Sequence, residues 1–496
     1  MVACGLLRAR QWAALALVTA SLLFWLVVRR DAAPWLRGPA PYPPEWQWGY
    51  EPKAPARAWP AALCGAAVVL LVASSSRLAR LAPRRAAAIL VTLAVLLGWG
   101  FQIALLHVEP GGARAELVRR TVSGSFTSYL KVAASGAARD PQAFLARYDE
   151  LLPSLRRSAR HAATHPPGAV LLFRGLIAVC NRLPALTRAV SSFVPVDPAA
   201  LDPPVTPPVM AAALLGASLF GIAGAAAAWP AAALARLVTG DALTGARVGA
   251  LWSVLPAPAL MTPELDQALA LPVAASSVAL AGALTPDARP AAAVSRAIVA
   301  GALAGLAGFF SYGALLLVAL SGMAVLAFRA EGAGWPRRAA LVFGLAAATA
   351  VAVLWLPAIF GHRPLASAAT ALAIHREQFT ARRSYGLWLA FNPIDIALFL
   401  GPPVAAVGAW RLARALRGPR HATDRLRLAT AAGLLLLVVS GVVRGEMGRI
   451  LIPLMPLLLV AACAEPEIPA RRAELPLLAA LLAGTAIAFR LSWELP

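Results

Sequence analysis

The chain has 496 residues, of which 60% are hydrophobic and only 14% are charged, and its mean hydropathy is +0.70. Soluble chains of this length carry more charge, so the composition excludes an ordinary soluble protein and indicates an integral membrane protein. The formal net charge of +22 would suit a nucleic-acid-binding protein, but the basic residues stand in short clusters between apolar runs. Membrane topology explains such clusters, so we expect a lipid bilayer as partner and no nucleic acid.

Apolar runs of about 17 to 25 residues recur along the chain, and each is long enough to cross a hydrocarbon core of roughly 30 Å. They are longer than the strands of a membrane β-barrel, so we expect helices. The sequence therefore predicts an all-α polytopic membrane protein with about thirteen transmembrane helices. The predicted spans are residues 11–28, 59–76, 86–107, 209–235, 245–261, 268–284, 291–309, 311–328, 339–360, 394–410, 428–443, 450–463 and 475–491.

These spans divide the chain into three parts. N-terminal transmembrane helices occupy residues 1–107, an outer loop region occupies residues 108–208, and a transmembrane helical bundle occupies residues 209–496. The first span is long and lacks a convincing cleavage site, so we expect a retained helix and not a signal peptide. Residues 107–165 carry too many charges to span, and we expect them to form helices lying on the membrane, broken at GGAR and ARDP.

Short Arg-rich loops predict the orientation in the membrane. They lie at residues 77–85, 329–338, 411–427 and near Arg471. The excess of Arg in cytoplasmic loops places all four in the cytoplasm. If residues 166–183 also crossed, the later basic loops would lie outside, so we predict a re-entrant or interfacial segment there, or a pair of half-crossings.

The motif HPPG, from His165 to Gly168, stands at the start of that segment. Its two prolines fix an extended backbone before the helix, although proline is also favoured in an ordinary first turn. His165 is a candidate substrate-binding residue. His161 and His165 are four residues apart, but no acidic partner stands at a fixed spacing, so no metal site is indicated. The cofactor stays unknown, and a divalent metal is compatible with the sequence.

Two further motifs, RGEMGR and ARRSY, place arginines at the ends of apolar runs. Arg presents a fork of donors that matches phosphate oxygens, so both motifs are candidates for binding a lipid phosphate or sugar. An interfacial salt bridge with snorkelling arginines is the alternative for RGEMGR, and an aromatic belt is the alternative for ARRSY. The candidate substrate-binding residues here are Arg382, Arg383, Tyr385, Arg444, Glu446 and Arg449.

Chemistry on the outer face needs a general base from a small set of carboxylates, most of which we expect to be solvated. Glu109 directly follows a predicted span, and Asp149 lies on the segment that leads into HPPG. These two are the candidate catalytic residues. Glu264 and Asp266 of TPELDQ belong to the same set of outer carboxylates.

A long outer loop of surface-lying helices that ends in HPPG resembles the GT-C superfamily of polytopic membrane glycosyltransferases. THPPGAVLLF stands where the dolichyl-phosphate-mannose mannosyltransferase and aminoarabinose transferase branches carry an HPPL-type motif. The segments GSFTSYLKVA, ELDQALAL, RSYGLWLAFNPIDIALFLGPP and RGEMGRILIPLMP resemble a bacterial group of the class. The mannosyltransferase branch has an acidic pair soon after the helix that opens the loop, whereas this chain offers only Glu109 and Glu116 there.

The resemblance implies a GT-C-like fold and a glycosyltransferase that moves a sugar from a polyprenyl-phosphate-linked donor to an acceptor. It also implies a carboxylate base near the start of the loop and basic residues on the lipid phosphate. We expect such an enzyme to lie in the bacterial inner membrane, with its active site facing the periplasm, and to act on the cell envelope. A membrane transporter or lipid flippase is the alternative, but transporters commonly show repeated halves and no internal repeat is visible.

Overall fold

The computed structural model describes residues 2–78, 82–124, 126–201, 204–332, 334–418, 421–465 and 474–495. The predicted basic turn near Arg471 lies outside these residues. The first part of the chain forms α1 (Val2–Arg29), η1 (Pro34–Arg37), β1 (Gly49–Tyr50), η2 (Pro55–Ala58), α2 (Trp59–Leu78) and α3 (Pro83–Leu106), where η marks a short 3-10 helix.

The region after α3 consists of short helices, and we call α4 to α8 the cap. They are α4 (Gly112–Val122), α5 (Tyr129–Ala134), η3 (Gly136–Ala138), α6 (Pro141–Ala146), α7 (Tyr148–Ser158) and α8 (Arg160–Ala163), followed by α9 (Gly168–Arg182), α10 (Pro184–Ser192) and η4 (Pro198–Ala200). The two expected breaks are confirmed: α4 begins inside GGAR, and Asp140 of ARDP caps α6 by accepting from the Gln142 amide at 2.9 Å.

The rest of the chain forms the longer helices and their connections. These are α11 (Pro207–Ala226), α12 (Ala228–Thr239), α13 (Ala242–Leu251), η5 (Trp252–Val254), α14 (Pro256–Leu260), α15 (Leu265–Ala283), α16 (Pro290–Phe310), α17 (Tyr312–Arg329), α18 (Trp335–Trp355), η6 (Leu356–Phe360), α19 (Pro364–Gln378), η7 (Thr380–Arg382), α20 (Tyr385–Leu400), α21 (Pro402–Leu416), α22 (Ala422–Ser440), α23 (Met447–Ile450), η8 (Ile452–Leu454), α24 (Met455–Cys463), α25 (Glu474–Arg490) and β2 (Trp493–Glu494).

The predicted all-α architecture is confirmed, and the long apolar helices fit a protein that spans a membrane. Within the described residues, eight helical runs are long and apolar enough to cross, or ten if each of two sharply bent helix pairs is one span. The predicted count of about thirteen is not confirmed.

Prolines and one glycine explain three of the differences. The predicted span 394–410 runs across Gly401, where α20 and α21 meet at 115°. Gly401 has a φ of +87° and is followed by two prolines, so the helix cannot continue. The predicted span 245–261 is broken before Pro256, because proline disfavours a helical conformation in the preceding residue. The predicted span 450–463 begins as η8 before it becomes α24.

The segment after HPPG forms the other bent pair. The axes of α9 and α10 differ by 107°, and the break falls between Arg182 and Pro184. A pair bent in this way is a broken span or a re-entrant loop. Residues 168–182 form the single helix α9, and the bend lies at the end of the segment 166–183, so the re-entrant or interfacial course of that segment stays a prediction.

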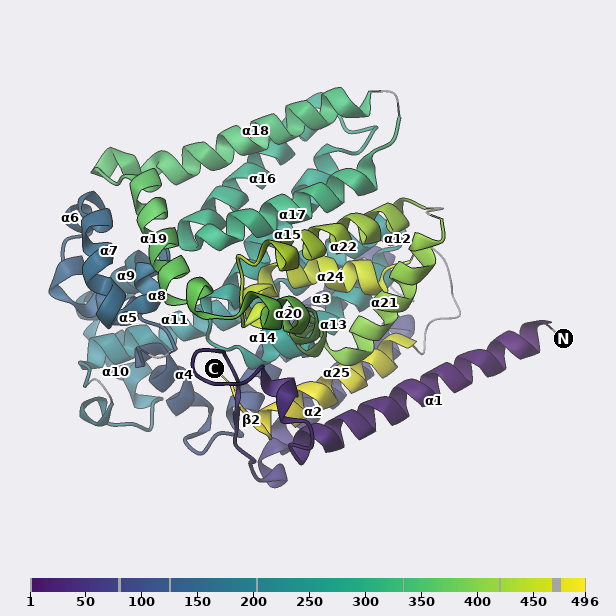
Figure 1. Cartoon of the computed structure of the whole chain (residues 1–496), viewed down its shortest axis with the longest axis horizontal. Coiled ribbons are helices and arrows are strands. Elements are labelled where there is room, and N and C mark those ends of the chain that lie inside the picture. Colours follow the sequence, from purple (N-terminus) through teal and green to yellow (C-terminus); the bar gives the residue numbers. More distant parts are fainter. Residues whose placement is uncertain are drawn as a thin grey trace.

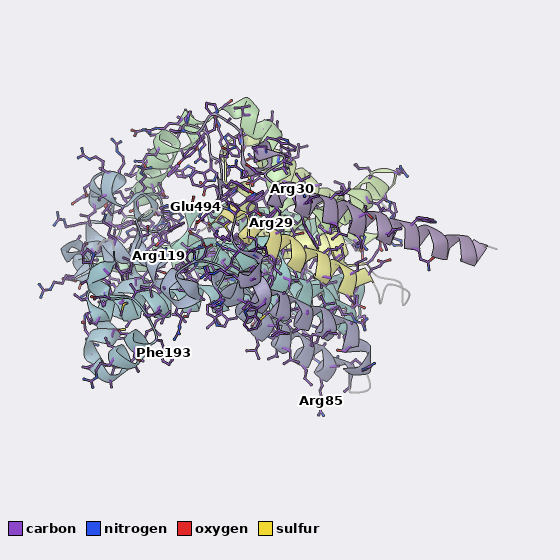
Figure 2. The ribbon with its side chains drawn as sticks, turned by 90° about the horizontal axis from the view of Figure 1, so that it is seen from below. Arg29, Arg30, Arg85, Arg119, Phe193 and Glu494 are labelled. Atoms are coloured by element: carbon purple, nitrogen blue, oxygen red, sulfur yellow. The ribbon has the colours of Figure 1, made fainter. Side chains whose placement is uncertain are left out.

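The long helices lie side by side, and the short helices of the cap gather at one end of them together with α9, α10 and α19 (Figure 1). The ends of α17, α21 and α25 that flank the Arg-rich loops point the other way (Figure 1). Figure 2 shows the same arrangement from another side: Arg119, which belongs to α4 of the cap, lies at one end, and Arg85 lies toward the other. The described helix ends that flank the Arg-rich loops at residues 77–85, 329–338 and 411–427 therefore lie at one end of the molecule.

Small residues let neighbouring long helices approach closely. Gly301 and Gly305 of α16 face α18, and a Cβ on Gly305 would lie 2.8 Å from the Ala350 carbonyl oxygen. Lipid tails are as apolar as leucine, so helices associate in a membrane mainly through such close van der Waals packing. The spacing of two glycines four residues apart is typical of this contact.

The loop after α1 and the C-terminal tail hold each other. β1 pairs antiparallel with β2, with Gly49 opposite Glu494. Arg29 at the end of α1 donates to the Leu491 carbonyl, and Figure 2 shows Arg29 close to Glu494. This contact fixes the loop of residues 30–58 beside the site described next.

Candidate functional site

Arg449 lies at the centre of a buried group of three carboxylates. Its guanidinium is 2.9 Å from Glu446 Oε2, 3.0 Å from Asp266 Oδ2 and 3.5 Å from Glu264 Oε2. None of these four side chains is more than 15% exposed. We call Arg449, Glu264, Asp266 and Glu446 the Arg449 cluster.

The acidic half of the cluster stands at the N-terminus of α15. Pro263 and Glu264 lie in the connection between α14 and α15. Glu264 is the N-cap residue of α15, and Asp266 lies in its first turn. Negative charge is favoured at a helix N-terminus because the free amide groups and the helix dipole stabilise it. Gln267 donates to Thr262 Oγ1 at 2.9 Å, which fixes the turn before the helix.

The other two residues of the cluster, Arg449 and Glu446, come from the strained RGEMGR turn. Glu446 has a φ of +56°, a left-handed conformation that is uncommon for a residue other than glycine. Asp395 of α20 stabilises the turn by accepting a hydrogen bond from the Gly448 amide at 2.8 Å. The turn aims Glu446 and Arg449 at each other, and strain of this kind is concentrated at functional sites.

Tyr129 and His161 of the cap and His165, which follows the cap before α9, interact with the charges of this cluster. The rings of Tyr129 and His165 meet edge to face with centroids 5.6 Å apart, and His165 Nδ1 lies 2.8 Å from the His161 carbonyl oxygen. Burial lowers the pKa of His165 to about 3, and the nearby charges of His161 and Arg449 act in the same direction. His165 is therefore neutral, and the positive charge of Arg449 acts on its ring.

Two carboxylates of the cluster differ in their proton affinity. Burial raises the pKa of Glu264 to about 7, and although Arg449 opposes this shift, the charges of Asp266 and Glu446 reinforce it. Burial also acts on Glu446, but Arg449 and Arg383 outweigh it and lower the pKa of that carboxyl. The arrangement thus holds one firmly ionised carboxylate and one that titrates near neutral pH.

Arg383 extends the cluster toward the N-terminal loop. Its guanidinium lies 3.6 Å from Glu446 Oε1. It also lies over the rings of Trp46, Phe379 and Trp388, at 5.8, 5.9 and 6.0 Å from their centroids. Cations are attracted to aromatic faces within about 6 Å, so the three rings hold the guanidinium in place.

Glu45 of the N-terminal loop anchors this aromatic group. It is buried, and it accepts hydrogen bonds from Trp388 Nε1 at 2.7 Å and from the Ser384 amide at 2.8 Å. A loop that is distant in sequence therefore positions Trp388 beside Arg383. No local sequence pattern predicts this contact.

The remaining predicted residues of the ARRSY and RGEMGR motifs have other partners. Arg444 donates to the carbonyl oxygens of Thr380 and Arg383 at 2.9 and 2.8 Å and lies over the Tyr385 ring. Tyr385 donates to the Val439 carbonyl at 2.6 Å. Arg382 is exposed. Arg444 and Tyr385 thus hold the two motifs together, beside the cluster and not in it.

Glu109, the first candidate base, lies in a separate buried network. Its Oε1 is 3.0 Å from Arg490 Nη1, 3.1 Å from Lys53 Nζ and 3.4 Å from Arg120 Nη2. Burial opposes ionisation, but these three cations lower the pKa of Glu109. The network adjoins the Arg449 cluster, because the charge of Arg120 also acts on Glu264.

Asp149, the second candidate base, lies apart from the cluster. Its Oδ2 is 2.8 Å from Nη2 of Arg363, the residue that precedes α19. Phe379 and Arg383 follow the other end of α19, so Asp149 and Arg383 lie at opposite ends of this helix. Of the predicted residues, the structure brings together His165, Arg383, Glu446 and Arg449, and it leaves Asp149 outside.

The contacts of Glu264, Asp266 and Tyr129 with this place were not predicted. Glu264 and Asp266 had a signal, since two carboxylates directly after a proline and before an apolar run mark a charged helix start at a membrane boundary. Tyr129 had none beyond its place in the cap. Within the described ranges, no group of three or more His, Cys, Asp or Glu side chains is arranged to hold a metal ion. Comparison of the chain with protein-family models, curated proteins and solved structures gave no match.

Proposed function

We propose that the chain is a membrane-embedded glycosyltransferase that transfers a sugar from a polyprenyl-phosphate-linked donor to an acceptor at the capped end. The observation that carries the proposal is the Arg449 cluster, in which a buried guanidinium and three carboxylates meet beside His165 of HPPG. Fixed donors in a poorly hydrated site stabilise charge that develops on a leaving phosphate far better than water-exposed donors do.

In the proposed reaction, Glu264 is the general base. It takes the proton of an acceptor hydroxyl, the hydroxyl oxygen forms a bond to the anomeric carbon, and the bond from that carbon to the phosphate oxygen breaks. The electron pair leaves with the polyprenyl phosphate, whose charge Arg449 and Arg383 stabilise. A base with a pKa of about 7 combines a useful ionised fraction with sufficient basicity at neutral pH.

Glu264 suits the role of base better than the two carboxylates favoured by sequence position. The three cations around Glu109 stabilise its ionised form and occupy its Oε1 atom, so it is a poor proton acceptor. Asp149 is paired with Arg363 away from the arginines that would hold the phosphate. A base must reach the proton that it abstracts, close to the group that stabilises the leaving phosphate.

The test is turnover by the purified full chain with a panel of labelled polyprenyl-phosphate sugars and membrane-extract acceptors. One donor should be consumed. Glu264→Gln should lower the rate about 10²- to 10⁴-fold, the usual contribution of a general base, while Asp287→Asn leaves it unchanged. Asp287 is an exposed carboxylate in the loop before α16 and serves as the matched control. No turnover of any donor would refute the proposed function, and a fully active Glu264→Gln variant would refute the base.

The two bent helix pairs favour a second candidate, a lipid transporter or flippase, because transporters bind substrate at broken helices. Reconstituted vesicles distinguish the two. A transporter would move a fluorescent polyprenyl phosphate across the bilayer without forming a glycosidic product, whereas the proposed transferase forms the product without moving the lipid.

A further inference from the structure

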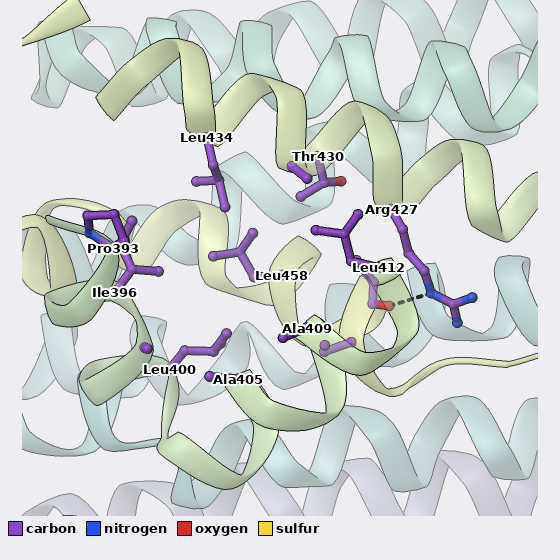
Figure 3. A pocket seen from close by; sticks show the side chains of 15 residues that line it. Pro393, Ile396, Leu400, Ala405, Ala409, Leu412, Arg427, Thr430, Leu434 and Leu458 are labelled. Atoms are coloured by element: carbon purple, nitrogen blue, oxygen red, sulfur yellow. Dashed lines mark hydrogen bonds between the residues drawn. The ribbon is translucent and has the colours of Figure 1, made fainter. Parts of the chain in front are cut away.

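A groove runs beside the bend at Gly401, away from the Arg449 cluster. It has a volume of about 170 Å³ and lies between α20, α21, α22 and α24 (Figure 3). Its lining is almost wholly apolar, with Leu400, Leu412, Leu434 and Leu458 among the residues that Figure 3 labels. The sharp turn at Gly401 leads α21 away from α20 and leaves this space between them.

The groove opens sideways to the surroundings of the helices. Pro393 and Ala409 on its rim are exposed, whereas Leu458 and Ala461 beneath them are buried. The bent pair α20 and α21 is one of the elements apolar enough to cross a membrane. A molecule that enters from this side therefore comes from the bilayer, and the apolar lining suits a hydrocarbon chain.

Positive charge marks one end of the groove. Arg427 lines that end and donates from Nε to the Ala461 carbonyl oxygen at 3.0 Å, the bond drawn in Figure 3. Among the described residues, Arg411, Arg414 and Arg427 form ion pairs with Glu465 and Asp424. This end of the groove is therefore rich in arginine.

Two exposed arginines, Arg414 and Arg417, lie at the end of α21. Arg414 has 48% of its side chain exposed although it is paired with Glu465, and Arg417 follows it one turn later on the same exposed end. Basic residues at a membrane boundary attract anionic lipid headgroups. The groove therefore combines a slot for a chain with a cationic site for its headgroup.

We propose that this groove binds one acyl chain of an anionic phospholipid from the leaflet at the Arg-rich end, with the lipid phosphate on Arg414 and Arg417. The site is distinct from that of the proposed sugar donor, whose phosphate would lie at the Arg449 cluster. The phospholipid wedges between α20 and α21 and stabilises the bend at Gly401. The inference does not depend on the proposed reaction.

The test is native mass spectrometry of the delipidated full chain, titrated with phosphatidylglycerol and with phosphatidylcholine of the same acyl chains. The first phosphatidylglycerol should bind roughly tenfold more tightly than phosphatidylcholine. Ala409→Trp fills the groove and should abolish this tight binding. Ala406→Trp is the matched control, because Ala406 is an exposed alanine of the same helix that does not line the groove.

The headgroup site is tested separately. The double variant Arg414→Gln with Arg417→Gln should lower phosphatidylglycerol binding to the phosphatidylcholine level, while Arg337→Gln leaves it unchanged. Arg337 is an exposed arginine in the first turn of α18, at the same end. If Ala409→Trp unfolds the protein, Ala405→Leu fills the same groove with a smaller change.

Three results would overturn the proposal: equal binding of the two lipids, equal behaviour of the Ala409 and Ala406 variants, or displacement of the phospholipid by an equimolar polyprenyl phosphate. The last result would assign the groove to the donor lipid instead.

Discussion

Glu264 and Glu446 contact the same guanidinium, yet their pKa values shift in opposite directions. Burial raises both pKa values, but Arg449, Arg383 and His161 together lower that of Glu446, while the negative charges of Asp266 and Glu446 raise that of Glu264 against Arg449 and Arg120. Glu446 therefore stays ionised and holds Arg449 in place, and Glu264 exchanges its proton near neutral pH. Separated pKa values of neighbouring carboxyl groups allow one site to contain both a fixed charge and an acid–base group.

This separation predicts the pH dependence of turnover. The base is active only when ionised, and the pKa of Glu264 is raised to about 7. The single-turnover rate with bound donor should therefore rise tenfold per pH unit below about 7 and level off above it. Glu264→Gln should remove this rise along with most of the rate. A rate that levels off near pH 4.5, the ordinary pKa of a glutamate, would contradict the assignment.

Arg449 also predicts a stability coupling. Arg449→Gln leaves three buried carboxylates without their shared cation and should lower the free energy of unfolding by about 3–5 kcal/mol. Glu446→Gln with Arg449→Gln removes one of the repelling charges, so the double variant should be less destabilised than the sum of the two single variants. Reversible unfolding in mixed micelles measures all three. Additive losses would show that the two side chains do not interact.

The network around Glu109 joins elements that are far apart in the chain. Glu109 follows α3, Arg120 lies on α4, Arg490 ends α25 and Lys53 belongs to the N-terminal loop. Arg490 is fully buried and also donates to the Leu495 carbonyl oxygen at 3.2 Å. One carboxylate therefore fixes the first and last parts of the chain against the cap.

The different surroundings of Glu109 and Asp149 predict different losses of stability when each carboxylate is replaced. Glu109→Gln leaves three cations together in a buried place and should cost about 3–5 kcal/mol of stability. Asp149→Asn breaks a pair whose Arg363 side chain is 56% exposed and should cost no more than about 1 kcal/mol. Unfolding in mixed micelles compares them. A stable Glu109→Gln protein that binds donor but does not turn it over would instead support Glu109 as the base.

The helices were predictable where apolar length alone decides and unpredictable where the backbone breaks. A bilayer-crossing helix needs a long apolar run, so α2, α3, α16 and α17 follow from hydropathy. Pro256 and Gly401 interrupt runs that are otherwise apolar, so a prediction from apolar length alone treats each run as one unbroken helix.

The site was predictable only in part. Arg449 and His165 carry local signals, but Arg449 and Asp266 are 183 positions apart, and their contact depends on which helix ends meet.

The whole molecule has two chemically different ends, and this polarity bears on the proposed sugar donor. The helix ends beside the Arg-rich loops lie away from the cap (Figure 1), while the charges of the Arg449 cluster act on Tyr129 of the cap and on His165. Because positively charged loops are retained in the cytoplasm, we expect the cluster on the opposite side of the membrane. Nucleotide sugars are cytoplasmic, so an active site on that side needs a lipid-linked donor.

Labelling of single cysteines tests this polarity. In a background without the four native cysteines, Arg382→Cys should react with a membrane-impermeant maleimide in intact cells or spheroplasts, because Arg382 is exposed beside the cluster. Arg337→Cys, at an exposed position in the first turn of α18, should react only after lysis. The reverse pattern would place the cluster in the cytoplasm, where nucleotide sugars are available, and would remove the reason for a polyprenyl-phosphate donor. Equal reaction of both cysteines before lysis would show that the two ends are not on opposite sides of the bilayer.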